Sequence, residues 1–157
     1  MKGKIVEVLL IAVMLAALFT GCGGSHSAYY VEPPKGNPEC SYLSKDQLKL
    51  VDDLLKKFTS WFNEIDPETI QSEDEFANKQ YNQITELYDE LYETIGNGGS
   101  SEESDAIDMA LSPVFDAGDV LMYNQFDSEN PDKFEIQADT WQNVRSTLVE
   151  AINYFYK

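Results

Sequence analysis

The chain has 157 residues, of which 28 are acidic and 11 are basic, so its formal net charge is -17. That balance excludes a nucleic-acid-binding protein that neutralises phosphates, because so few cations among so many anions cannot form a basic patch. The same argument weighs against electrostatic binding to anionic lipids. A hydrophobic content of 43% with 12% aromatic residues is too high for a disordered acidic chain, and we expect one globular domain.

The first 22 residues have the layout of an export signal. Lys2 and Lys4 precede an uncharged apolar run over 8–19, and Glu7 limits this run to twelve residues. A transmembrane helix needs about 20 apolar residues, whereas the observed length fits the apolar core of a signal peptide. The run ends in the sequence Leu18-Phe19-Thr20-Gly21-Cys22.

This ending resembles the lipobox of bacterial lipoproteins, with a small residue directly before a cysteine. Phe19 departs from the leucine that is commonest three places before that cysteine. The resemblance covers only a signal peptide over 1–21, and it implies cleavage before Cys22 and acylation of Cys22. It also implies lipid anchoring in the cell envelope, at the extracytoplasmic face of a bacterial membrane. The alternative is an ordinary secretory peptide, which would leave Cys22 free to form a disulfide with Cys40.

Residues 22–43 are predicted to be a flexible tether, lipidated at its first residue. Glycine and serine open the segment, and it contains three of the six prolines of the chain, which cannot continue a helix. His26 is the only histidine, and we interpret it as a solvated spacer residue. Because the folded part then has no histidine to activate a thiol, Cys40 is not expected to be catalytic.

The remaining residues, 44–157, are predicted to form an acidic all-α domain. Capping boxes are expected at Ser44 with Gln47 and at Ser72 with Glu75, and Pro113 should break the third helix. The spacing of apolar residues predicts four amphipathic helices, over about 45–65, 73–95, 102–124 and 140–156. Four such helices bury their apolar faces best in an antiparallel up-down-up-down bundle. Only residues 134–137 could form a short extended piece.

No catalytic or cofactor signature is present, neither for haem, di-iron, zinc or nucleotide binding nor for a serine nucleophile. We therefore expect no enzymatic activity and no cofactor. Calcium is the metal that the carboxylates suit best, and the acid-rich stretches 102–105 and 127–132 were the candidates. Neither stretch has the EF-hand spacing, so no metal site is assigned.

Two features are candidate binding residues. Arg145 is the only arginine, and it lies near the apolar face of the last helix. It either pairs with a carboxylate of a neighbouring helix or holds an anion between helices. Tyr81, Tyr88 and Tyr92 follow one edge of the second helix, where they either border the core or form an exposed strip for a partner.

The negative charge lies downstream of the first predicted helix, which is itself neutral. Residues 66–157 contain 21 acidic and four basic residues. Such a surface attracts cationic partners, although it also serves solubility and keeps a domain away from anionic lipids. The sequence favours a membrane-anchored, non-enzymatic interaction module for a cationic protein or cell-wall partner. The alternative is a lipoprotein that binds a small ligand or calcium in a pocket within the bundle.

Overall fold

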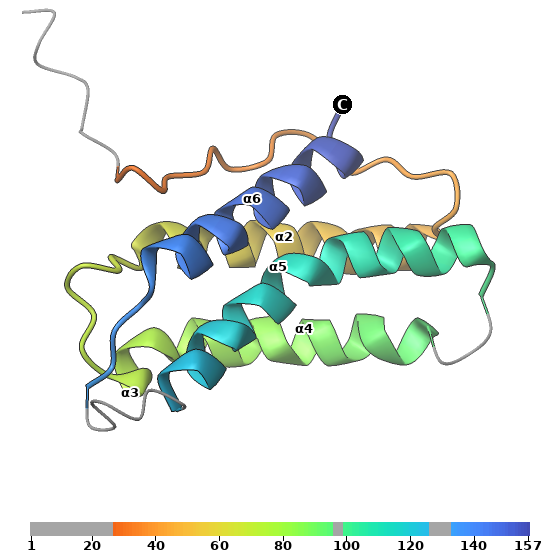
Figure 1. The fold of residues 1–157 in the computed structure, drawn as a ribbon. Coiled ribbons are helices and arrows are strands. Elements are labelled where there is room, and N and C mark those ends of the chain that lie inside the picture. Colours follow the sequence, from red (N-terminus) through yellow and green to blue (C-terminus); the bar gives the residue numbers. More distant parts are fainter. Residues whose placement is uncertain (1–26, 96–98, 126–132) are drawn as a thin grey trace, which may run out of the picture.

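The computed structural model describes residues 27–95, 99–125 and 133–157, and this part of the chain is helical without strands. The expected export signal and Cys22 lie outside the described residues. The helices, shown in Figure 1, are α2 (Lys45–Glu64), α3 (Glu73–Phe76), α4 (Lys79–Ile95), α5 (Ser101–Gln125) and α6 (Ala138–Phe155). Packing of α5 against α4 and α6, and of α2 against α4, forms a helical bundle, which confirms the predicted all-α class. None of the described helices is sufficiently long and apolar to cross a membrane.

The first long helix, α2, starts where the capping box predicted. The Ser44 hydroxyl accepts from the Gln47 amide at 3.2 Å, and the Gln47 side chain accepts from the Ser44 amide at 2.7 Å. Two otherwise unpaired amides are thereby satisfied. The buried face of α2 carries the apolar residues at helical spacing, among them Val51, Leu54, Leu55, Phe58, Trp61 and Phe62.

The single helix predicted over 73–95 is wrong, because α3 ends at Phe76 and α4 begins at Lys79. Ala77 leaves the helical conformation, with φ -90° and ψ 55°. The Asn78 side chain then accepts from the amides of Gln80 and Tyr81, at 3.1 and 3.3 Å. Asparagine side chains compete with the helix in this way, so Asn78 starts a new helix instead of continuing the old one.

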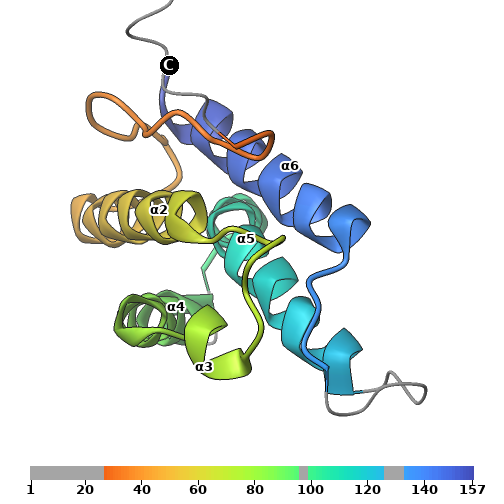
Figure 2. The same cartoon turned by 90° about the vertical axis from the view of Figure 1, so that its left-hand side faces the viewer.

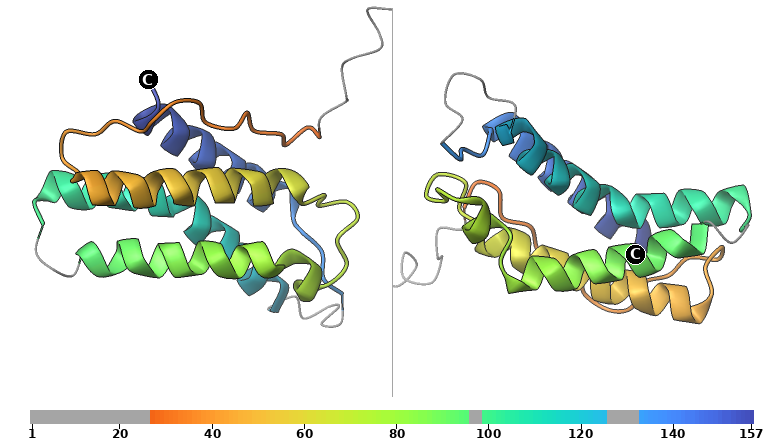
Figure 3. Two further views of the ribbon diagram at one scale, coloured as in Figure 1. Left: turned by 180° about the vertical axis from the view of Figure 1, so that it is seen from behind. Right: turned by 90° about the horizontal axis from the view of Figure 1, so that it is seen from below.

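Helix α5 contains Pro113 in its interior and changes direction about halfway along its length (Figure 3, right). Proline has no amide hydrogen for the carbonyl four residues before it, here Met109, and its ring crowds that carbonyl. Close to the bend, the Ser112 hydroxyl donates to the Asp108 carbonyl at 2.9 Å, a contact that favours bending. The two halves of α5 therefore take different paths, so the break expected at Pro113 is a bend within one helix.

The centre of the core is an aromatic cluster where α2, α3, α4 and α6 meet. Trp61 of α2 lies 5.1 Å from Phe76 and 4.8 Å from Tyr81, measured between ring centroids. Its Nε1 donates to the Phe76 carbonyl at 3.2 Å. Phe62 stacks on Trp141 of α6 with centroids 4.5 Å apart. The short helix α3 is thus held in place by the indole that its own Phe76 packs against.

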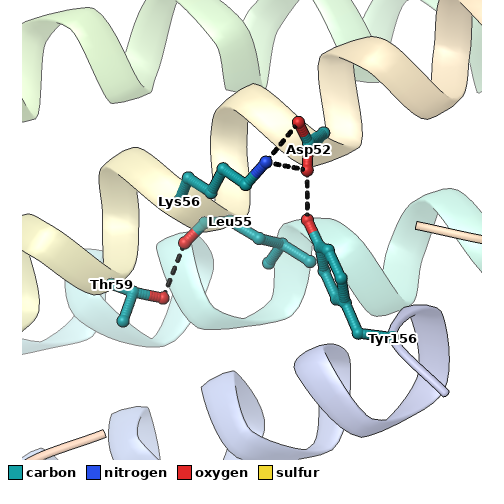
Figure 4. Close-up of polar contacts among 5 residues, drawn as sticks. All are labelled: Asp52, Leu55, Lys56, Thr59 and Tyr156. Carbon is teal, nitrogen blue, oxygen red and sulfur yellow. Dashed lines mark hydrogen bonds and ion pairs between the residues drawn. The ribbon is translucent and has the colours of Figure 1, made fainter. Parts of the chain in front are cut away.

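Helix α6 begins at Ala138, with Gln137 as the N-cap but without a side-chain cap. The helix predicted over about 140–156 therefore starts two residues earlier than expected. Residues 134–137, where a short extended piece was expected, are irregular, and Ile136 is buried. Beyond the other end of α6, the Tyr156 hydroxyl donates to Asp52 of α2 at 2.7 Å, and Lys56 pairs with the same carboxylate at 2.7 Å (Figure 4).

Residues 27–43, the described part of the expected tether, lie against the helices (Figures 1 and 2). Val31 is 3% exposed, and its amide and carbonyl both bond to the Asn63 side chain of α2, at 2.9 and 2.8 Å. The Glu39 amide donates to the Phe155 carbonyl at 2.8 Å. This part of the expected tether is thus packed on the bundle from Val31 onwards.

Candidate functional site

The exposed large apolar side chains of the described residues are concentrated in one place. There are four of them, Tyr42, Tyr92, Phe115 and Met122, and each is more than half exposed. Three of the four, all except Tyr42, line two adjoining hollows between α4 and α5. Clustered exposed apolar groups with a polar rim are typical of interaction sites.

We call the two hollows together the α4–α5 groove, and both include Tyr88 and Phe115. The Met122 hollow has a volume of about 400 Å³ and is lined by Tyr81, Thr85, Tyr88, Asp89, Val114, Phe115, Gly118, Asp119 and Met122. The Tyr92 hollow has a volume of about 430 Å³ and is lined by Tyr88, Tyr92, Asp108, Leu111, Ser112, Phe115, Asp116 and Thr147. Apart from Thr147 of α6, every lining residue comes from α4 or α5.

The bend in α5 positions the Met122 hollow. Beyond the bend, α5 runs beside α6 and away from α4 (Figure 3, right). The lining residues of this hollow that belong to α5, from Val114 to Met122, all follow Pro113. Gly118 adds room, because a Cβ atom placed there would meet nothing within 4 Å. A helix without the proline would be expected to stay closer to α4.

The charge of the groove is negative. Its lining includes four carboxylates, Asp89, Asp108, Asp116 and Asp119, and no lysine, arginine or histidine. Burial raises the pKa of the Tyr88 hydroxyl, with further contributions from Tyr92, Asp89 and Asp108. The tyrosine therefore stays neutral, and the groove combines aromatic rings with negative charge.

Asp116 is the least well satisfied carboxylate of the groove. Its Oδ2 atom is buried, and the described residues supply no hydrogen-bond donor to it. Burial raises the pKa of the Asp116 carboxyl, a hydrogen bond with the Thr147 side chain acts in the opposite direction, and the charge of Asp119 adds to the increase. An ionised carboxylate with a buried, unpaired oxygen destabilises the fold that buries it.

We predict that Asp116→Asn raises the free energy of unfolding at pH 7 by up to about 1 kcal/mol, since the side chain is partly exposed. The folded state has the higher pKa, so between the unfolded and folded pKa values it binds more protons than the unfolded state. Asp116 therefore lowers stability fully above its folded pKa, and this cost disappears as the pH falls towards the ordinary value of 3.8. Urea unfolding at several pH values measures the effect, and a difference that persists unchanged at pH 3.8 would contradict it.

The exposure of the three predicted tyrosines rises along α4, so they neither all border the core nor all form an exposed strip. Tyr81 is 8% exposed and belongs to the core beside Trp61, and burial raises the pKa of its hydroxyl. Tyr88 is half-buried, and Tyr92 is 59% exposed. The rings of Tyr88 and Tyr92 are parallel within 7°, with centroids 6.0 Å apart. All three tyrosines thus line the groove, and Tyr88 and Tyr92 are the more exposed of them.

Arg145 is not brought to this groove. It lies on α6, half-buried, with a buried Nε for which the described residues supply no hydrogen-bond acceptor. No carboxylate of the described segments pairs with it, so the expected ion pair with a neighbouring helix is not seen there.

Neither of the two acidic stretches considered for calcium is described as a loop in the structure. Residues 102–105 belong to the first turn of α5, where carboxylates complement the free amides, and Glu103 accepts from Gln47 at 2.5 Å. The stretch 127–132 lies outside the described residues. Within the described ranges, no group of three or more histidine, cysteine, aspartate or glutamate side chains could hold a metal ion.

A larger hollow, of about 630 Å³, lies among connecting segments at another place on the domain. Its lining includes Glu68, Gln71, Lys133 and Glu135, and the last two pair with each other at 2.7 Å. None of the exposed large apolar side chains lines it. It is therefore a weaker candidate than the α4–α5 groove.

Phe115 and Met122 were missed from the sequence. Met122 follows the bend in α5 and is 54% exposed. Phe115 stands among the polar residues Ser112, Asp116 and Asp119, and an aromatic residue on a polar face was the available signal. Comparison with family models, curated proteins and solved structures gave no match, so the assignment of function depends on the groove.

Proposed function

We propose that this protein is a non-enzymatic interaction module of the bacterial cell envelope, whose α4–α5 groove binds a cationic, apolar segment of another protein. The observation that carries the proposal is the gathering of three of the four exposed large apolar side chains in one groove lined by four aspartates. Apolar anchors with a charged rim are the usual composition of a protein-binding surface.

The charge of the groove narrows the class of partner. Aspartates around aromatic rings repel nucleic acids and anionic lipid headgroups, and they attract lysine and arginine side chains. An amphipathic segment with apolar residues on one face and basic residues beside them complements both properties. This is the acidic-surface interaction inferred from the sequence, now assigned to particular residues.

The proposal includes the location of the protein. A signal peptide over 1–21 and a lipid on Cys22 would place the domain at the extracytoplasmic face of the membrane, as the lipobox-like sequence suggests. The proposed scaffold is an up-down-up-down arrangement of α2, α4, α5 and α6, which is supported by the chain directions in Figure 1.

We expect Gly118→Leu to reduce partner binding at least about tenfold, because the new side chain would occupy the Met122 hollow, where a Cβ meets no atom within 4 Å. The same change should not destabilise α5, since leucine favours a helix over glycine by roughly 0.5–1 kcal/mol. Phe115→Ala should weaken binding by a similar factor through loss of an anchor. The measurement is quantitative capture of envelope proteins by the immobilised full chain in nonionic detergent.

The matched control is Tyr42→Ala, which removes the exposed aromatic residue outside the groove. It should leave capture unchanged. Capture by the acidic groove should also weaken as salt is raised, because the Debye length falls from about 10 Å at 0.1 M to about 3 Å at 1 M. If the same proteins are recovered by Gly118→Leu, or equally at low and high salt, the proposal is wrong.

Binding of a small ligand is the second candidate function. The observation that favours it is the volume of the two hollows, each of which lies within the range of small-molecule pockets. Such binding should depend less on ionic strength than capture of a basic segment.

A further inference from the structure

We propose that the Tyr92 hollow is an ammonium-binding subsite, which takes a protonated alkylammonium group between the rings of Tyr88, Tyr92 and Phe115 and the carboxylate of Asp116. The inference rests on the proposed function and deepens it, because it names the chemical group that the groove recognises. Three observations carry it: the ring pair of Tyr88 and Tyr92, the carboxylates of Asp108 and Asp116 in the lining, and the absence of a cation among the lining residues.

The rings supply the walls of the subsite. Tyr88 and Tyr92 are one helical turn apart on α4 and keep parallel rings, while Phe115 faces the same hollow from α5 with 62% of its surface exposed. The face of an aromatic ring attracts a cation, and the attraction grows when water is excluded. Sets of such rings are the usual means by which proteins hold alkylated ammonium groups.

The carboxylate supplies the counter-charge. Asp116 lines the hollow and is partly exposed, although its Oδ2 atom is closed to solvent. A cation bound beside the carboxylate would offset the cost of its partly buried charge. Asp108 adds a second negative charge to the same lining.

The geometry favours an ammonium group over a guanidinium or a metal ion. An arginine binds a carboxylate best through both oxygens at once, whereas the Oδ2 atom of Asp116 is closed to solvent, so this carboxylate cannot offer both oxygens to a ligand in the hollow. Calcium needs six or more oxygen ligands, which a wall of three aromatic rings does not provide. An alkylammonium, as at the tip of a lysine side chain, uses one point charge and an apolar stem, and this matches the hollow.

The first experiment uses n-butylammonium chloride, with n-butanol as its uncharged counterpart. Each is titrated into the full chain in nonionic detergent, and the NMR resonances of Tyr88, Tyr92 and Phe115 are followed. We expect the amine to bind at least about tenfold more tightly than the alcohol. Equal affinities would overturn the subsite, and so would the absence of any shift with the amine.

Variants test the two parts of the subsite separately. Asp116→Asn should weaken amine binding at least about fivefold, and Tyr92→Leu about two- to fivefold, the range expected for one exposed ring. Tyr92→Phe, which keeps the ring, should restore most of the affinity lost in Tyr92→Leu. Glu86→Gln removes an exposed charge of α4 that does not line the groove, and it should leave affinity unchanged. Amine binding that is insensitive to Asp116→Asn would overturn the proposal.

The source of the ammonium group is decided by a second probe, an amphipathic peptide of leucine and lysine compared with one of leucine and glutamine. Lysine of a protein partner is supported if the lysine peptide competes with the amine and binds more tightly. A free amine is supported if the peptide does not compete. If Gly118→Leu abolishes capture of envelope proteins while no amine binds, the subsite fails and the proposed function stands. If the amine binds but Gly118→Leu leaves capture of envelope proteins unchanged, the subsite stands and the proposed function fails.

Discussion

Replacing Trp61 with alanine is expected to lower the free energy of unfolding by about 3–5 kcal/mol, the usual cost of removing a large aromatic residue from a core. Trp61 is fully buried and contacts Phe58, Phe76, Tyr81 and Trp141. The substitution leaves a cavity at the meeting point of α2, α3, α4 and α6, and it removes the donor to the Phe76 carbonyl. This loss is a large fraction of the stability of a small domain. Because Phe76 and Tyr81 contact the indole directly, α3 and the start of α4 should be affected first.

Urea unfolding followed by circular dichroism measures this effect, with the fluorescence of Trp141 as a second probe. Trp61→Phe is the informative comparison, since it keeps an aromatic ring but lacks the N–H group, and it should cost clearly less than alanine. A loss below about 1 kcal/mol for Trp61→Ala would contradict the central position assigned to this residue.

Asn63→Ala is expected to cost about 2 kcal/mol, because it removes two hydrogen bonds at once and leaves the amide and carbonyl of Val31 without those partners. Val31 is almost fully buried, so water cannot easily replace the lost contacts. The substitution should also loosen the chain around Val31 from α2, whereas Glu39 keeps its bond to Phe155 of α6. Hydrogen exchange of the Val31 amide reports that loosening directly.

Two variants control this prediction. Asn63→Asp keeps an acceptor for the Val31 amide but lacks the donor to the carbonyl, so its loss should be intermediate. Asn153→Ala removes an exposed asparagine of α6 and should be close to neutral. If Asn63→Ala unfolds at the same urea concentration as the wild type, the Val31 contact does not stabilise the domain.

Much of the helical framework follows from local patterns. The predicted box at Ser44 and Gln47 forms with both hydrogen bonds, because its partners are three residues apart and need no tertiary contact. The box at Ser72 forms only half, since Glu75 accepts instead from the Gln71 amide. Asn78 was overlooked because asparagine is tolerated inside a helix as well as at its start, and packing of Phe76 decides between them.

The candidate site was predictable only in part. Tyr88 and Tyr92 were identified because helical spacing places them on one edge of α4. Their partner Phe115 is distant in sequence, and its exposure depends on the direction α5 takes after Pro113, which periodicity does not encode. The absence of an ion pair at Arg145 among the described residues could not be predicted for a similar reason. Whether two helices form such a pair depends on how each is rotated relative to the other, which periodicity does not encode.

The Val31 contact also sets a length. Nine peptide steps separate Cys22 from Val31, and a fully extended chain spans at most about 3.6 Å per residue. With a lipid on Cys22, the bundle could therefore rise only about 30 Å from its anchor, a distance comparable to its own size. A partner fixed in the same membrane would then be met at a high effective concentration, so that even a weak groove could hold it.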